Sequence, residues 1–137
     1  MKRMIVNKYG GPENLILDRV DSPLINDSSV RIKVENIGVN FADTLVIKGR
    51  YQERPRPPFS PGLELSGTII ETGKKVLNHK IGNRVIGIAK FGAYCNEIVM
   101  PAENVYKIPD SMDFVSAASF PVAYGTAFGA IDWKGNL

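Results

Sequence analysis

The chain has 137 residues, of which 44% are hydrophobic and 23% are charged, with a formal net charge of +3. This length and composition are typical of one globular domain with its own core. The dispersed basic residues give no reason to expect a nucleic-acid partner. The single cysteine, Cys95, excludes an internal disulfide, which fits a reducing compartment and a cytoplasmic location.

The N-terminus has no apolar stretch of the kind found in signal peptides. Short strands separated by turn residues then fill most of the chain. Strands are expected at 4–9, 15–20, 30–37, 64–71, 84–89, 93–100 and 105–108. In 30–37, apolar and polar residues alternate, so Val30 and Ile32 should face a core and Arg31 should face water. Gly67 interrupts 64–71 and indicates a bulge or the close approach of another backbone.

Helices are expected in two places. Residues 40–48 form a short helix that ends at Gly49, and four prolines in 51–61 then predict an irregular arm. Residues 110–134 form a helical segment that begins near Asp110 or Ser111, with Pro121 opening a second helix. The uncharged run 114–131 contains this proline and many small residues, so no membrane span is expected. The pattern predicts a mainly β barrel or sandwich with a helical appendix.

Metal and nucleotide motifs are not found in the sequence. Zinc needs three or four Cys, His or carboxylate ligands, but the only histidine, His79, and the only cysteine, Cys95, have no partner at ligand spacing. His79 is expected at the surface and Cys95 in the core. Neither a Walker loop nor GxGxxG occurs, so the chain carries no nucleotide fingerprint of its own.

Five polar residues remain as candidates for chemistry near the mouth of the barrel: Asn40, Asp43, Tyr51, Glu64 and Thr126. Each also has a purely structural interpretation. Asn40 and Asp43 would start the helix at residue 41, and Tyr51 would pack on the proline arm. Glu64 would pair with Arg84 or be exposed, and Thr126 would be a helix-surface hydroxyl.

Six motifs occur in one order along the chain, at 8–15, 37–45, 49–51, 58–67, 81–86 and 124–126. With them the sequence resembles the N-terminal catalytic domain of medium-chain dehydrogenases/reductases, in particular the zinc-independent NADPH:quinone oxidoreductase branch. The resemblance implies a GroES-like, partly open β-barrel over residues 1–137, with 110–134 helical and leading toward a nucleotide-binding domain. That Rossmann domain is absent from the sequence, so the chain resembles a truncated enzyme or an isolated domain.

The resemblance also locates the zinc positions of the related alcohol dehydrogenases. Asn40 stands in place of a zinc-binding cysteine, Leu63 in place of the zinc-binding histidine, and the third ligand falls near Val122. The proton-relay positions hold Ala42 and Leu45. These replacements imply an enzyme without zinc.

The implied reaction is hydride delivery from NADPH to a quinone or an activated C=C. Asn40 would hydrogen-bond the nicotinamide or the substrate oxygen, Thr126 would contact the cofactor, and Asp43, Tyr51 and Glu64 would line the substrate cleft. Tyr51 and Asn40 are thus the expected catalytic residues. The isolated chain is expected to be inactive, since NADPH would be held mainly by the missing domain.

Two other interpretations remain open. The chain resembles enoyl-thioester reductases of the same superfamily, in which Tyr51 would be the proton donor, and it also fits a non-catalytic GroES-like module. The substrate, the choice between NADPH and NADH, and a homo-oligomeric state are left open by the sequence.

Overall fold

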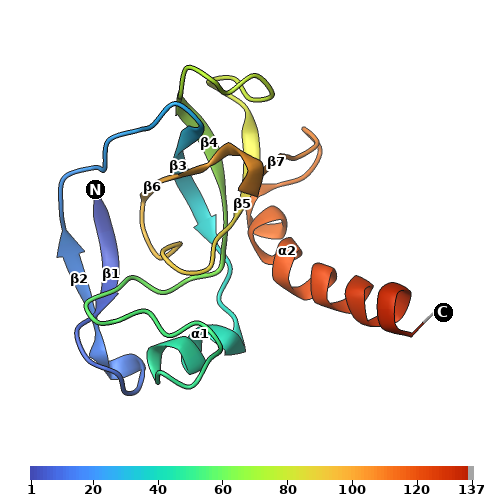
Figure 1. Ribbon diagram of the computed structural model, residues 1–137. Helices are drawn as coiled ribbons and strands as arrows, with labels where there is room; N and C mark the ends of the chain where they lie inside the picture. Colours follow the sequence, from blue (N-terminus) through green and yellow to red (C-terminus); the bar gives the residue numbers. More distant parts are fainter. Residues whose placement is uncertain (136–137) are drawn as a thin grey trace.

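The computed structural model describes residues 1–135. It contains an N-terminal β-hairpin, a five-stranded sheet and a C-terminal helix that projects from the β body (Figure 1). The hairpin pairs β1 (Lys2–Val6) with β2 (Leu15–Arg19). The sheet has the order β6-β3-β4-β5-β7, formed by β3 (Ser29–Ile37), β4 (Glu64–Thr72), β5 (Arg84–Ile88), β6 (Glu97–Pro101) and β7 (Val105–Lys107).

The helices are α1 (Phe41–Ile47) and α2 (Phe114–Phe128), with a π-helical extension at Gly129–Lys134 and short 3-10 turns at Pro12–Asn14 and Ala102–Asn104. The architecture is mainly β and forms an open rather than a closed barrel, as the sequence predicts. Every strand pair within residues 1–135 is antiparallel, so this part of the chain holds no parallel βαβ unit.

The strand β3 organises the main core. Val30 and Ile32 are fully buried, which confirms the alternation predicted for this segment. They pack with residues of the neighbouring strands, including Leu65, Ile69 and Val85. Hydrophobic burial of these side chains is the main favourable term that holds the sheet together.

The prediction that Arg31 faces water is wrong. Its side chain is only 13% exposed and makes ion pairs with Glu71 at 2.7 Å and Glu97 at 2.8 Å. Because β3 lies between β4 and β6, one carboxylate approaches Arg31 from each neighbouring strand. The hydrogen bond to Glu71 is the main reason that the pKa of Arg31 is raised.

Gly67 lies where two backbones approach closely. It pairs with Val34 next to a register shift on β3, and a Cβ at Gly67 would overlap the carbonyl oxygen of Lys33. The predicted close approach at this glycine is therefore confirmed.

A smaller core lies beneath α1. It contains Val6, Val46, Ile47 and Phe59, so it joins the hairpin, the short helix and the proline arm. The helix ends where predicted, because Gly49 adopts a φ of 66°, a left-handed conformation that favours glycine.

The C-terminal segment differs from the prediction. It forms one continuous helix that begins after Asp113, whose side chain accepts from Ser116 N–H at 2.8 Å, rather than at Asp110 or Ser111. Pro121 lies inside α2 instead of opening a second helix.

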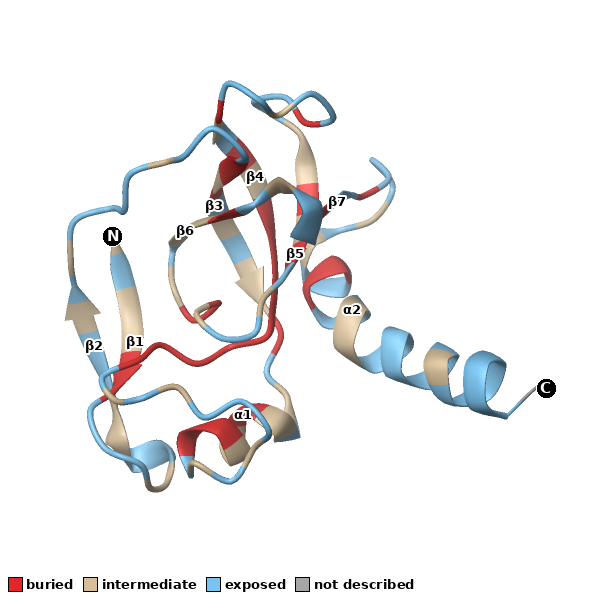
Figure 2. Ribbon diagram, viewed as in Figure 1, coloured by how far each residue is buried: buried red, intermediate tan, exposed pale blue. Residues whose placement is uncertain are grey.

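The first turn of α2 is fixed to the sheet, whereas the rest is exposed. Arg84 donates to the carbonyl groups of Pro109, Asp110 and Met112 and stacks on Phe114, and Ser66 Oγ donates to the Phe114 carbonyl at 2.6 Å. Figure 2 shows that most of α2 beyond this anchor is exposed or half-buried. The exposed large side chains include Phe120, Tyr124 and Phe128 of α2 and Ile131 and Trp133 of its π-helical extension.

The exposed helix also has the dimensions of a membrane span. The 21 residues Phe114–Lys134 are long and apolar enough to cross a membrane by length and composition alone. Core helices of soluble proteins meet the same test, so this property does not distinguish between a membrane and a protein neighbour.

His79 and Cys95 occupy unexpected places. His79 is 9% exposed, with Nε2 3.2 Å from the Ala102 carbonyl oxygen, so its predicted surface position is wrong. Cys95 is half-buried in the loop before β6, and its thiol donates to the Gly92 carbonyl at 3.3 Å. Burial raises the pKa of the Cys95 thiol to about 11.

We predict opposite effects for two glycine-to-alanine substitutions. Gly67→Ala should lower the free energy of unfolding by about 1–3 kcal/mol, because its Cβ meets the backbone of β3. Gly125→Ala should raise it by about 0.5–1 kcal/mol, because this helical glycine has open space around it. Urea unfolding measures both values, and equal effects of the two substitutions would contradict the packing described for Gly67.

Candidate functional site

The carboxylate of Glu64, at the start of β4, joins two distant parts of the chain. The side chain is 1% exposed. Its Oε1 accepts from Asn40 Nδ2 at 2.7 Å, and its Oε2 accepts from the backbone N–H of Val122 at 2.8 Å. Glu64 therefore connects the start of α1 to the middle of α2. Both structural interpretations from the sequence, pairing with Arg84 and exposure, are wrong.

Two features of the local sequence make room for this carboxylate. A Cβ at Gly38 would overlap the Glu64 side chain, and the Gly38 N–H donates to the Glu64 carbonyl at 3.2 Å. On the other side, Pro121 has no amide hydrogen and interrupts the regular helical hydrogen bonds. The amide that follows it, at Val122, is the one that donates to Glu64.

Asp43 has a structural place rather than a position in a cleft. It is 1% exposed, and its Oδ2 accepts from the Asn40 N–H at 2.8 Å and from the Tyr94 hydroxyl at 3.2 Å. Burial raises the pKa of Asp43, against the opposing effect of these donors. Asp43 does not line the cavity that holds Tyr51 and Thr126, so its predicted place in a substrate cleft stays a prediction, whereas its structural role at the start of α1 is confirmed. Burial also raises the pKa of Tyr94, so its hydroxyl remains a donor.

Tyr51 and Thr126 line one cavity of about 410 Å³, although 75 residues separate them in sequence. The cavity lies between the proline arm at 51–53, the end of β5 with the residues after it at 88–90, and one side of α2. Its wall also includes Leu63 and Val122, so the bond from Val122 to Glu64 connects the cavity to Asn40. Glu64 itself lies behind this wall, so its predicted place in the cleft lining is corrected to a position that supports the wall.

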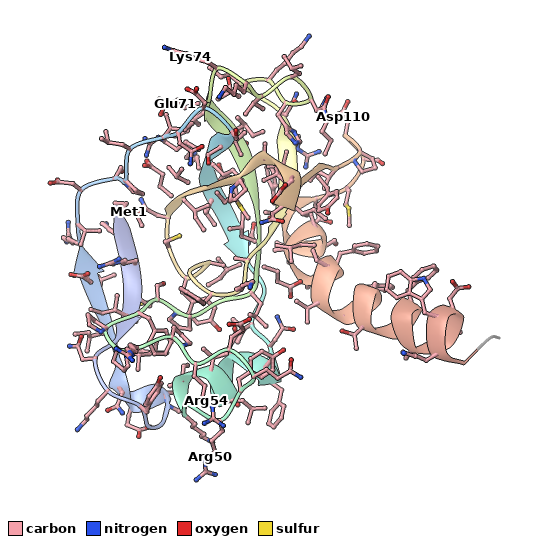
Figure 3. All side chains as sticks on the ribbon, in the orientation of Figure 1. Met1, Arg50, Arg54, Glu71, Lys74 and Asp110 are labelled. Carbon is pink, nitrogen blue, oxygen red and sulfur yellow. The ribbon has the colours of Figure 1, made fainter. Side chains whose placement is uncertain are left out.

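The rim of the cavity carries charges that the sequence analysis missed. Lys90 Nζ lies 3.5 Å from Glu53 Oε1, and both residues line the cavity from different loops. No motif in a single sequence marks this pair, because the two residues are brought together only by the fold. The exposed Arg50 and Arg54 lie at the edge of the molecule next to α1, away from α2 (Figure 3), and neither lines this cavity.

The side chains at the zinc positions of the resemblance do not suit zinc. Asn40 supplies an amide, Leu63 an aliphatic chain and Val122 a backbone N–H, none of which is a ligand that zinc prefers. Over residues 1–135, no cluster of three His, Cys, Asp or Glu side chains could hold a metal ion. The donor chemistry of this place is that of a hydrogen-bonded network.

Comparison with known proteins gives one family. Residues 26–110 match the alcohol dehydrogenase GroES-like domain. The chain is 38% identical over 137 residues to a quinone oxidoreductase-like protein 2 homolog of Nematostella vectensis, covering 99% of this chain and 37% of that protein. It is 39% identical over 123 residues to quinone oxidoreductase-like protein 2 of Mus musculus, covering 90% of this chain and 35% of that protein. The chain thus spans about a third of the length of these relatives.

Solved structures give the same result. The human synaptic vesicle membrane protein VAT-1 homolog-like protein superimposes with a TM-score of 0.95 at 35% identity, over 100% of this chain and 44% of that one. The Escherichia coli quinone oxidoreductase complexed with NADPH superimposes with a TM-score of 0.90 at 26% identity, over 96% of this chain and 40% of that one. Both comparisons agree with the fold described above.

We predict that Tyr94→Phe destabilises the protein in a pH-dependent way. Losing one donor to the buried Asp43 carboxylate should cost about 1–3 kcal/mol at neutral pH and raise the pKa of Asp43 further. The decrease in the free energy of unfolding should have its full size at pH values where Asp43 is ionised in both the unmodified and the variant protein. It should shrink as the pH falls and Asp43 becomes protonated.

Urea unfolding between neutral and acidic pH measures this difference. Tyr106→Phe is the matched control, since Tyr106 is 52% exposed. A loss that does not change with pH would show that the Tyr94 hydroxyl does not act on Asp43.

Proposed function

We propose, since the chain belongs to the alcohol dehydrogenase GroES-like domain family, that it is the substrate domain of a zinc-independent oxidoreductase. The proposed enzyme delivers hydride from NADPH to a quinone or an activated C=C. The relatives named quinone oxidoreductase-like and the neighbour named a quinone oxidoreductase complexed with NADPH support this choice.

The observation that carries the proposal is the network around Glu64. At the place where related alcohol dehydrogenases would hold zinc, a buried carboxylate joins Asn40 to Val122 at the wall of the cavity. Such a site can orient ligands by hydrogen bonds and exclude water, but it offers no Lewis acid of its own. We therefore infer that activity depends on positioning.

Three of the five predicted site residues have a direct place in this proposal. Thr126, which lines the cavity, and Asn40, which bonds to Glu64 behind the wall, would hold the nicotinamide end of the cofactor. Tyr51 would line the substrate side of the cavity. NADPH supplies the hydride when it is bound. Because the chain spans about a third of its relatives, the proposal includes a separate nucleotide-binding domain that holds the rest of the cofactor.

One observation favours the second candidate, an enoyl-thioester reductase. Tyr51 lines the cavity and also packs against the smaller core, and no described residue forms a hydrogen bond with its hydroxyl. A phenol without a protein partner is free to donate a proton to a reduced enoyl substrate. The two candidates therefore differ in what Tyr51 does.

Tyr51→Phe separates the two candidates in a protein that joins this chain to its nucleotide-binding domain. If the enzyme is a quinone reductase, kcat for quinone should change by less than about tenfold, because Tyr51 only lines the cleft. If it is an enoyl-thioester reductase, loss of the proton donor should lower kcat by about 10²–10⁴-fold. Tyr106→Phe is the control for loss of an exposed hydroxyl. Absence of both activities in the unmodified protein would favour a non-catalytic module.

The 137-residue chain alone should bind NADPH weakly or not at all. The pyrophosphate of a dinucleotide is normally held by a glycine-rich loop and a helix N-terminus, and no GxGxxG occurs in this sequence. Isothermal titration calorimetry with NADPH measures the affinity directly. Micromolar binding by the chain alone would contradict the proposed division of the cofactor site.

A further inference from the structure

A second cavity, here called the hairpin cavity, lies between the N-terminal hairpin and the end of β3. It is lined by residues 2–4 and Leu17 of the hairpin, residues 34–37 of β3 and residues 94–96. Its volume is about 340 Å³, which is within the range of small-molecule pockets. It shares no lining residue with the cavity around Tyr51, and it contains no residue of α2.

The hairpin cavity forms where β3 loses one of its two neighbouring strands. β6 pairs with β3 only as far as Lys33, which lies opposite Glu97. Residues 94–96 bond to β1 instead: the Met4 N–H donates to the carbonyl of residue 94 at 2.8 Å, and the N–H of residue 96 donates to the carbonyl of Lys2 at 3.0 Å. The last residues of β3, 36–37, therefore pair with β4 alone and leave a space on the side of the hairpin.

The walls of the hairpin cavity include apolar side chains that the fold covers only in part. Met4 and Leu17 lie opposite each other in the hairpin register, so their side chains share one face. Leu17 is 59% exposed, and Val34 and Ile37 are half-buried against the main core. Burial raises the pKa of the Cys95 thiol to about 11, so this wall residue is neutral at pH 7. Removing such apolar surface from water favours the binding of an apolar ligand.

One positive charge in the lining has no protein partner. Glu35, the only acidic residue of the lining, pairs with Lys33 at 2.9 Å, and Arg3 pairs with Asp18 at 3.0 Å. The exposed Lys2 forms no ion pair with any residue of 1–135. The charge that complements this cavity is therefore negative.

We propose that the hairpin cavity is a second binding site, which takes a small molecule with an apolar body and one anionic group, such as an aromatic carboxylate. The apolar body lies against Met4, Leu17 and Val34, and the anionic group pairs with the Lys2 ammonium. A cationic ligand is disfavoured, because Glu35 is already paired. The inference does not rest on the proposed function, since it requires neither a cofactor nor turnover.

NMR titration of the 137-residue chain with 2-naphthoate tests the site, and 2-naphthamide is the neutral probe of matched shape. Both should shift the backbone amides of residues 2–4, 17 and 34–37. The dissociation constant for naphthoate should be about 1 mM. Naphthamide should bind about threefold more weakly, because one exposed ion pair contributes little.

Two pairs of variants separate the apolar contact from the charge. Leu17→Glu should weaken naphthoate binding by about tenfold, because it places a carboxylate on the apolar wall. Leu24→Glu is its control, since Leu24 is 93% exposed and lies outside the lining. Lys2→Gln should weaken naphthoate binding by about threefold and leave naphthamide binding unchanged. Lys8→Gln, an exposed lysine outside the lining, is the control for net charge.

Several results would overturn the inference. One is the absence of shifts at these amides in about 10 mM naphthoate, or shifts confined to the exposed end of α2. Another is equal naphthoate affinity of Lys2→Gln and Lys8→Gln, a comparison that stands even if Leu17→Glu does not fold. Shifts of the same amides on dilution of the protein alone would show that a second copy of the chain covers this surface. Failure to reduce any quinone or enone would bear only on the proposed function.

Discussion

The buried carboxylate of Glu64 is the interaction on which the candidate site depends. Removing a charge from water is costly unless it is fully hydrogen-bonded, and here each oxygen has its own N–H donor. Those donors come from the start of α1, which otherwise packs on the hairpin and the proline arm, and from the middle of α2, whose first turn is held by the sheet. The space at Gly38 and the proline at position 121 both serve this single contact. The carboxylate therefore fixes two walls of the site relative to each other.

The helix α2 is anchored at one end and exposed at the other. Ser66 bonds a backbone carbonyl of its first turn, Arg84 bonds the carbonyl groups of the residues just before the helix, and Glu64 holds its middle. Beyond that point, aromatic and aliphatic side chains are open to solvent, including Phe128 and Trp133. Exposed apolar surface of this kind is typical of a face that another element covers. The cavity uses the anchored part of the helix, which explains how an otherwise exposed element can position a site residue.

The burial of polar groups is where the sequence analysis failed. Arg31, His79 and Glu64 were expected at the surface or in ordinary pairs, since isolated charged residues usually face water. Glu64 and His79 are buried and Arg31 is half-buried, because their partners come from segments far away in the chain. A single sequence contains no record of those partners, and the alternation of β3 indicates only which face a residue occupies. The motif resemblance identified Asn40 as important, yet it could not show that a carboxylate fixes its orientation.

The sequence by itself determined the mainly β architecture, the short helix after Asn40 with its stop at Gly49, and the close approach at Gly67. These features follow from local periodicity and from the conformational freedom of glycine. Only the tertiary structure decided that Asp43 is a buried structural acid, that Tyr51 and Thr126 share one cavity, and that Glu64 joins α1 to α2. The physical reason is that these arrangements depend on contacts between residues distant in sequence, which local patterns do not encode.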